Sequence, residues 1–216
     1  MKVKLDSAEL ELWSEDYNAL AKFVNFIIPW IVDKSWIKKD EAKFERWENA
    51  QKLMIKAKKI IDDSQKEIKK PPLKISTPLL ENASLENEED LQNKWANLLA
   101  NSLTWEKNIT PAYIEILKEL STLEVHILDK IYNDAILSNE NITDVQFWTD
   151  KVCELFKINI EEWRLIVDNF FRLRLAEAPA VQWIKMWDFS PVWKTNDFFQ
   201  MTTLWYKFIE ACKFND

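Results

Sequence analysis

Glycine is absent from the 216 residues of this chain. At the usual frequency of roughly 7%, about 15 glycines would be ordinary at this length. Phosphate-binding loops of the GxxxxGK(S/T) and GxGxxG types need glycine for positive φ and for close approach of the backbone to phosphate. The nucleophile elbow of hydrolases needs it at a sharp turn. The sequence therefore excludes nucleotide binding through such loops and catalysis through such an elbow.

Histidine and cysteine are also scarce. The chain has one histidine, His126, and two distant cysteines, Cys153 and Cys212, without an HExxH or CxxC pattern. These residues cannot build a histidine and cysteine zinc site, so we expect no metal, no cofactor and a non-enzymatic protein. Unpaired cysteine spacing and the lack of a recognisable signal peptide favour a cytoplasmic location.

Positive charge is in deficit overall, because the net charge is −7. Residues 34–70 carry a local excess of five positive charges, whereas residues 81–90 hold five acidic residues and no basic one. A negative chain does not suit general nucleic-acid binding, so we expect a protein partner or a homo-oligomer. Residues 23–32 are apolar but too short to span a membrane, and a peripheral membrane contact is an alternative.

Apolar residues recur mostly at helical spacing, which predicts a mainly α-helical fold. Residues 39–70 form a long basic amphipathic helix that ends before Pro71 and Pro72. A first helix is predicted after an N-cap at Asp6 or Ser7. The remaining predicted helices cover residues 78–83, 87–103, 111–120, a segment from Ser121 with a capping box to Glu124, residues 143–156, residues 159–174 and residues 203–213.

Two short strands, residues 176–187 and 193–202, are predicted to form a hairpin near the C-terminus. The expected fold is all-α with this small hairpin, a helical core followed by a winged-helix-like part. The predicted domains are residues 1–70, 71–120 and 121–216. Residues 121–216 contain 10 basic and 15 acidic residues, which favours protein contact or dimerisation over DNA binding.

Several segments resemble a known family. They are PPLKI at residues 71–75, PLLENASLE at 78–86, LQNKWANLLAN at 91–101, PAYIEILKELS at 111–121 and MTTLWYKFIEAC at 201–212. In these segments the chain resembles the Abi-alpha (abortive infection alpha) family. The resemblance implies a bacterial or phage-associated helical protein linked to abortive infection, and it brings no catalytic residues with it.

Charge density and motif position nominate candidate binding residues in two regions. They are Lys52, Lys56, Lys58 and Lys59 on the basic helix, and Glu86, Glu89, Trp95 and Asn101 in the family segments. The first hypothesis is a non-enzymatic sensor or interaction protein of phage defence. The second is a winged-helix transcription regulator that binds DNA. The third is a metal-dependent hydrolase or nuclease, which requires at least two of Glu81, Glu86, Glu89 and Asp90 to converge.

Tryptophan, in contrast to glycine, is abundant, with 12 residues. Trp105, Trp183, Trp193 and Trp205 stand where glycine would be ordinary, three of them in turn-like settings. A gene in which the codon UGA specifies glycine yields this combination when UGA is translated as tryptophan. We therefore hypothesise that several tryptophans are glycines in the cell, and UGG codons at these four positions would contradict it.

Overall fold

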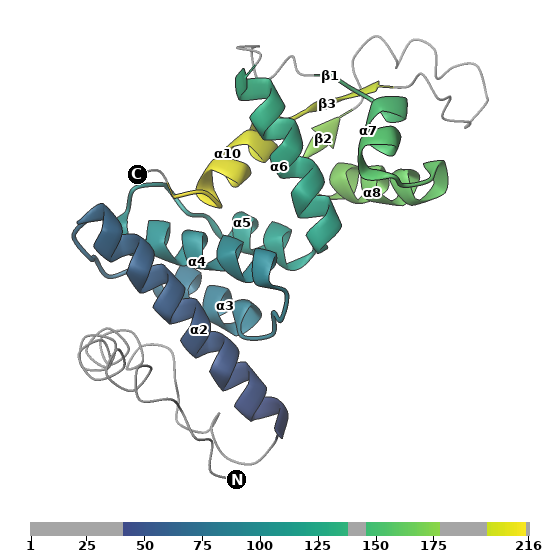
Figure 1. Cartoon of the computed structure of the whole chain (residues 1–216). Coiled ribbons are helices and arrows are strands. Elements are labelled where there is room, and N and C mark those ends of the chain that lie inside the picture. The colour runs from purple at the N-terminus through teal and green to yellow at the C-terminus, as the bar shows by residue number, and fades with distance from the viewer. Residues whose placement is uncertain (1–40, 138–145, 178–197, 215–216) are drawn as a thin grey trace. The chain divides into compact units, whose positions relative to one another are not determined.

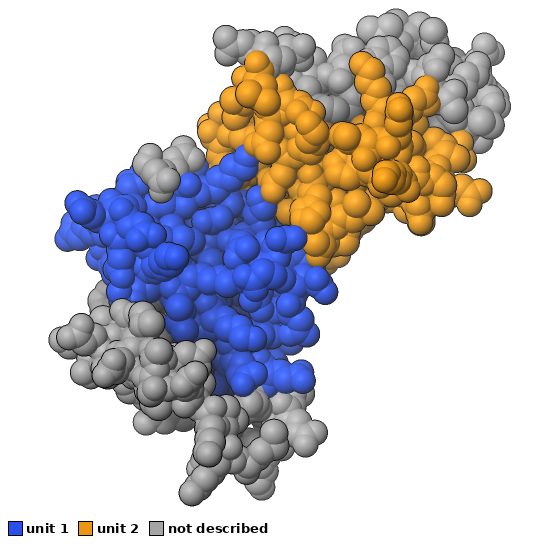
Figure 2. Space-filling view, viewed as in Figure 1, with its two compact units in different colours: residues 1–118, 211–216 blue, residues 119–210 orange. Residues whose placement is uncertain are grey.

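The computed structural model describes residues 41–137, 146–177 and 198–214. The chain divides into two compact units, which are coloured separately in Figure 2. Unit 1 comprises Met1–Lys118 and Ala211–Asp216, and unit 2 comprises Glu119–Glu210. This division lies close to the boundary predicted after residue 120, whereas the described residues on either side of the boundary predicted after residue 70, residues 41–70 and 71–118, belong to one unit.

Unit 1 is helical in its described part. Its helices are α2 (Glu41–Ser64), α3 (Leu73–Ala83), α4 (Glu89–Thr104) and α5 (Pro111–Lys118). Helix α2 packs along α4, and α3 contacts α2, α4 and α5 (Figure 1). The interior is filled by large apolar side chains that are less than 2% exposed, namely Leu53, Ile61, Leu79, Trp95, Leu98 and Leu99.

Helix α2 ends at Ser64, so the prediction of a helix through Lys70 is wrong at its C-terminal end. Gln65 adopts φ of 53°, the left-handed conformation that commonly ends a helix. Farther along, the backbone N–H of Lys69 donates to the carbonyl of Leu103 at 2.6 Å. A hydrogen bond to the end of α4 therefore replaces the helical hydrogen bonds that this charged segment was expected to form.

Helix α3 begins at Leu73 and is longer than the predicted segment of residues 78–83. Pro72 precedes the helix and Pro78 lies inside it. An internal proline removes one helical hydrogen bond and usually marks a break, which is why the sequence placed the start at Pro78. The buried side chains of Ile75 and Leu79 hold both halves of α3 in the core.

Unit 2 combines helices with a small antiparallel sheet. In chain order its elements are α6 (Thr122–Leu137), β1 (Gln146–Trp148), α7 (Thr149–Phe156), α8 (Ile160–Arg172), β2 (Ala176–Glu177), β3 (Phe198–Met201) and α10 (Thr203–Ala211), whose last residue falls in unit 1. The strand order is β1-β3-β2, with Phe147 opposite Phe199 and Ala176 opposite Met201. The mainly helical fold class with a small C-terminal hairpin is thereby confirmed.

The start of the predicted helix of residues 143–156 is wrong, because Gln146–Trp148 forms strand β1 and α7 begins only at Thr149. Strand β1 pairs with β3, about 50 positions later in the chain, and local periodicity carries no signal for such a partner. The hairpin is present as β2 and β3, while the predicted strand residues 178–187 and 193–197 lie outside the described residues.

Large aromatic side chains fill the interior of unit 2. Trp163, Phe170, Phe199, Trp205 and Phe208 are all at most 2% exposed. Helix α8 begins with a capping box in which Asn159 and Glu162 cap each other's backbone N–H groups. Within the described residues, no helix is both long and apolar enough to cross a lipid bilayer.

In the part of the chain that the structure describes, four residues adopt positive φ although none is glycine: Gln65, Trp105, Lys157 and Arg174. A side chain in this conformation costs about 1–2 kcal/mol, and glycine is its usual occupant after a helix. Trp105 has φ of 56° directly after α4 and is 59% exposed, which agrees with a glycine at this position. Trp205 is instead fully buried, and Trp183 and Trp193 lie outside the described residues.

Candidate interaction surfaces

The four candidate lysines of α2 have different surroundings. Lys56 Nζ lies 2.6 Å from Glu89 Oε1 and 3.4 Å from Gln92 Oε1, so it links α2 to α4 within unit 1. Lys58 pairs with Asp62 along the same helix. Lys52 and Lys59 are exposed, and neither has an ion-pair partner among the described residues. These two lysines are therefore available to a partner.

The acidic candidates at the start of α4 have structural partners. Glu86 Oε1 accepts hydrogen bonds from the backbone N–H groups of Asn87 and Glu88, both at 3.0 Å. Glu89 lies in the first turn of α4, where a carboxylate complements the helix dipole, and it also holds Lys56. The structure thus brings together two candidates, Lys56 and Glu89, as a contact between helices.

Trp95 and Asn101 are core residues, each 1% exposed. Trp95 fills the interior between helices, and the side-chain amide of Asn101 donates to the carbonyls of Ala211 and Lys213 at 2.9 Å each. Neither side chain reaches the surface of unit 1. The sequence-based interpretation of these residues as contacts for a partner is therefore corrected: they belong to the fold.

Helix α8 presents a mixed face to solvent. Its apolar stripe of Trp163, Ile166, Val167 and Phe170 is buried in unit 2. On the opposite side, Leu165 is 72% exposed, and Glu161 and Asp168 flank it at helical spacing. Neither acidic side chain has an ion-pair partner among the residues that the structure describes. This outward face is an exposed leucine between two unpaired carboxylates.

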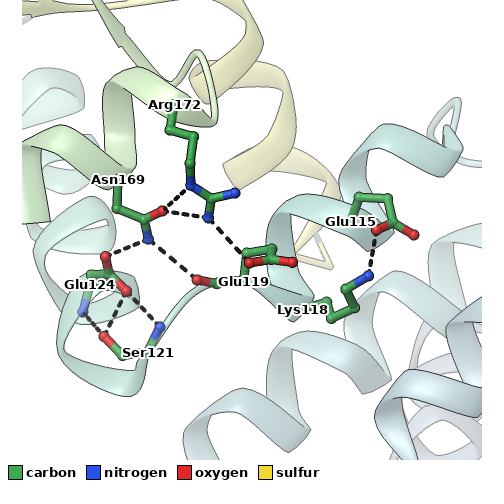
Figure 3. Close-up of polar contacts among 7 residues, drawn as sticks. All are labelled: Glu115, Lys118, Glu119, Ser121, Glu124, Asn169 and Arg172. Carbon is green, nitrogen blue, oxygen red and sulfur yellow. Dashed lines mark hydrogen bonds and ion pairs between the residues drawn. The ribbon is translucent and has the colours of Figure 1, made fainter.

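A polar cluster fixes α8 to the start of α6 (Figure 3). The amide of Asn169 donates to Glu124 Oε1 at 2.7 Å and to the carbonyl of Glu119 at 3.3 Å. Glu124 Oε2 accepts from the backbone and hydroxyl of Ser121, both at 2.7 Å, as the predicted capping box requires. Arg172 contacts both Asn169 and Glu119. The orientation of α8 in unit 2 is therefore held by hydrogen bonds as well as by its buried stripe.

Sequence reasoning did not nominate Ile55, Glu161, Leu165 or Asp168. Ile55 is 43% exposed on α2, on the same outward stripe as Lys52 and Lys59. The sequences of α2 and α8 contained a signal for these residues. Each helix has more apolar residues than its core-facing stripe can hold, so at least one must lie on the solvent side. Assigning the buried stripe first would have left Ile55 and Leu165 on the solvent side.

Among the described residues, three titratable side chains have clearly raised pKa values, namely Tyr132, Cys153 and Tyr206, and burial is the main cause for Tyr132. Tyr206 donates to Glu210 Oε1 at 2.7 Å, and this hydrogen bond raises the pKa of Tyr206 to about 12. Burial, with a smaller effect of Asp150, raises the pKa of the Cys153 thiol. A thiol with a raised pKa is a weak nucleophile at neutral pH.

In the described ranges, no group of three or more His, Cys, Asp or Glu side chains is placed to hold a metal ion. The hydrolase alternative required carboxylates of residues 81–90 to converge. Glu86 and Glu89 instead have separate partners, the backbone N–H groups before α4 and the ammonium group of Lys56. These two carboxylates are therefore engaged by different groups.

The fold and these surfaces define a helical protein with a small C-terminal sheet. The model of the family described as Abortive infection alpha matches residues 43–204, which is most of the chain. The chain belongs to this family, and the resemblance of its segments is confirmed. Neither the curated proteins nor the solved structures contain a match to it.

Proposed function

We propose that this chain is a non-enzymatic interaction protein of abortive infection, in which unit 2 is a winged-helix module used for protein contact. Family membership supports the link to abortive infection. The outward face of α8 carries the proposal of protein contact. An exposed leucine between two carboxylates suits a protein surface and repels phosphate.

The order of elements supports the winged-helix assignment. A helix, a strand, two helices and two further strands follow one another, and the last strand, β3, lies between β1 and β2. Helices α7 and α8 are separated by three residues, as in a helix-turn-helix. Lys157 at φ of 54° makes the turn after α7. In such a module α8 occupies the position of the recognition helix.

The charge of α8 favours protein over DNA as the partner. DNA-binding helices of this type place basic and amide side chains against phosphates and base edges. The outward face of α8 instead places Glu161, Leu165 and Asp168 where the groove would lie. Arg172 is the basic residue of this face, and it already pairs with Glu119.

A phage challenge tests the proposal. In a culture that carries the gene, infected cells are expected to die individually while the population survives. Leu165→Ser is expected to abolish this protection without lowering the Tm of the protein. Leu73→Ser, which changes a leucine of unit 1 that is 54% exposed, is the matched control and should leave protection intact. Equal plaque counts with and without the gene, across a broad phage panel, would contradict a role in defence.

DNA binding is the competing function, and a titration with duplex DNA separates the two. The proposal predicts no binding at 0.05 M or at 0.2 M salt, concentrations that differ enough to weaken a phosphate-contacting protein by about 10³-fold or more. A complex that forms at low salt and weakens steeply at higher salt would show that unit 2 is a DNA-binding module.

A further inference from the structure

We propose that the outward face of α8 binds the outward face of α2 of a second copy of this chain. This inference rests on the proposed function and names the partner for its protein-contact surface. The α2 face consists of Lys52, Ile55 and Lys59, and the α8 face consists of Glu161, Leu165 and Asp168. On each face an exposed apolar residue lies between two side chains of like charge. These charges are positive on α2 and negative on α8.

The spacing of the two faces matches in antiparallel orientation. On α2, Ile55 lies three positions after Lys52 and four before Lys59, and on α8 Leu165 lies three positions before Asp168 and four after Glu161. Antiparallel pairing therefore places Lys52 opposite Asp168, Ile55 opposite Leu165 and Lys59 opposite Glu161. The outer charges of each face are about 10 Å apart along their helix, so all three contacts form together.

The next turn continues the match. Glu48 lies four positions before Lys52 on the exposed side of α2, and Arg172 lies four positions after Asp168 on the exposed side of α8. The same register therefore sets a carboxylate opposite a guanidinium that also pairs with Glu119 of its own chain, so this fourth contact is secondary to the other three. A parallel orientation would not give this series, because the apolar residues of the two helices would then be offset by one position.

Within the described parts of the chain, the charged residues of the two faces are not paired. The four charged side chains of the two faces, Lys52, Lys59, Glu161 and Asp168, have no ion-pair partner among the described residues. Ile55 and Leu165 are 43% and 72% exposed. Pairing would bury both apolar side chains and bring each charge to an opposite one, which fixes the register and excludes like-charged partners.

One pair of helices buries less than the usual area of a stable complex, so the association is expected to be weak and concentration-dependent. Sedimentation velocity over a range of protein concentrations measures it. The double substitutions K52E/K59E and E161K/D168K each place like charges opposite one another. Each is expected to raise the dissociation constant at least about tenfold while leaving the circular dichroism spectrum unchanged. Because Glu161 lies in the first turn of α8, E161K/D168K should also lower the Tm slightly, by the loss of helix-dipole stabilisation.

Mixing the variants gives the decisive result. K52E/K59E has two acidic faces and E161K/D168K has two basic faces, so an equimolar mixture should form complexes although neither protein self-associates. The quadruple variant, with both faces reversed, should self-associate again. K69E/K74E is the matched control, because it changes two exposed lysines outside both faces by the same total charge and should associate like the native chain.

Failure of this inference is distinguishable from failure of the proposed function. A native chain that stays a monomer at every concentration, or a mixture that forms no complex, would overturn self-association through these faces. Protection against phage that is lost in E161K/D168K but kept in K52E/K59E would leave the protein-contact function standing and assign α8 to another protein. If the native gene protects cells and neither variant changes that protection, the outward face of α8 has no part in the function.

Discussion

The side-chain amide of Asn101 donates a hydrogen bond to the carbonyl oxygen of Ala211, 110 positions later in the chain. The same amide also reaches the carbonyl of Lys213, and the neighbouring Asn97 donates to the carbonyl of Cys212 at 3.1 Å. Two asparagines one turn apart on α4 therefore hold the C-terminal residues onto unit 1. The buried amide of Asn101 donates to two backbone carbonyls and therefore stabilises the fold, although its polar character suggested a surface contact.

Substitution of Asn101 by alanine is expected to destabilise unit 1 by about 1–3 kcal/mol, because it leaves backbone carbonyls without a donor in a buried position. Asn93→Ala, on the exposed side of the same helix, should change the free energy of unfolding by less than about 0.5 kcal/mol. Chemical denaturation of both variants measures the difference. Equal stabilities would show that Asn101 does not hold the C-terminus.

Replacement of Trp105 by glycine is expected to stabilise the protein by about 1 kcal/mol, because residue 105 has positive φ and its side chain is mostly exposed. Thermal unfolding measures the effect. The recoding hypothesis predicts in addition that protein purified from the cells that naturally encode it carries glycine at this position, which peptide mass spectrometry detects.

Trp205→Gly is expected to act in the opposite direction. Its indole is fully buried and lies edge-on to Tyr132 at 6.1 Å between ring centroids, so removal should cost about 3–5 kcal/mol through lost packing and a cavity. Its indole N–H has no hydrogen-bond partner among the described residues, which offsets part of that loss. A stabilised glycine variant would indicate that tryptophan is foreign to this site.

Tyr206 gives the protein a dependence on alkaline pH. Its hydrogen bond to Glu210 raises its pKa to about 12 in the folded state, above the usual value of about 10. The folded state therefore binds this proton more tightly, and the resulting stabilisation is complete below about pH 10 and is lost as the pH rises to about 12. Tyr206→Phe should remove this loss between pH 10 and 12, as measured by urea unfolding at several pH values.

Glu124 is a buried carboxylate, 6% exposed, with three hydrogen-bond donors around it. Glu124→Gln should destabilise unit 2 by about 1–3 kcal/mol. Both oxygens of the Glu124 carboxylate accept hydrogen bonds, whereas the NH2 group of a glutamine would face a donor in place of one of these oxygens. Glu115→Gln is the matched control, since its ion pair with Lys118 is exposed and such pairs contribute at most about 1 kcal/mol. A similar loss in both variants would contradict the role of the cluster in Figure 3.

The signals that sequence alone carried were mostly local. The capping box of Ser121 and Glu124 was predicted and is present, because its geometry depends on residues three positions apart. Helices α4, α5 and α8 were placed within a few residues of their observed ends. Their apolar stripes recur every three or four positions, and each stripe is buried as that spacing requires.

Distant partners decided what local patterns could not. Strand β1 was predicted as helix because its pairing residues in β3 lie about 50 positions away. The end of α2 was misplaced because the segment after it bonds to the end of α4. Lys56 and Lys52 look alike in the sequence, and only packing turns the first towards Glu89 and leaves the second in solvent.

The sequence by itself determined a mainly helical, acidic chain of the abortive infection alpha family that lacks glycine-dependent loops. It did so through composition, periodicity and local motifs, all of which act between near neighbours. Tertiary structure decided that Trp95 and Asn101 are buried, that β3 lies between β1 and β2, and that Ile55 of α2 and Leu165 of α8 are exposed. Burial and strand pairing depend on residues far apart in the chain, so no local pattern specifies them.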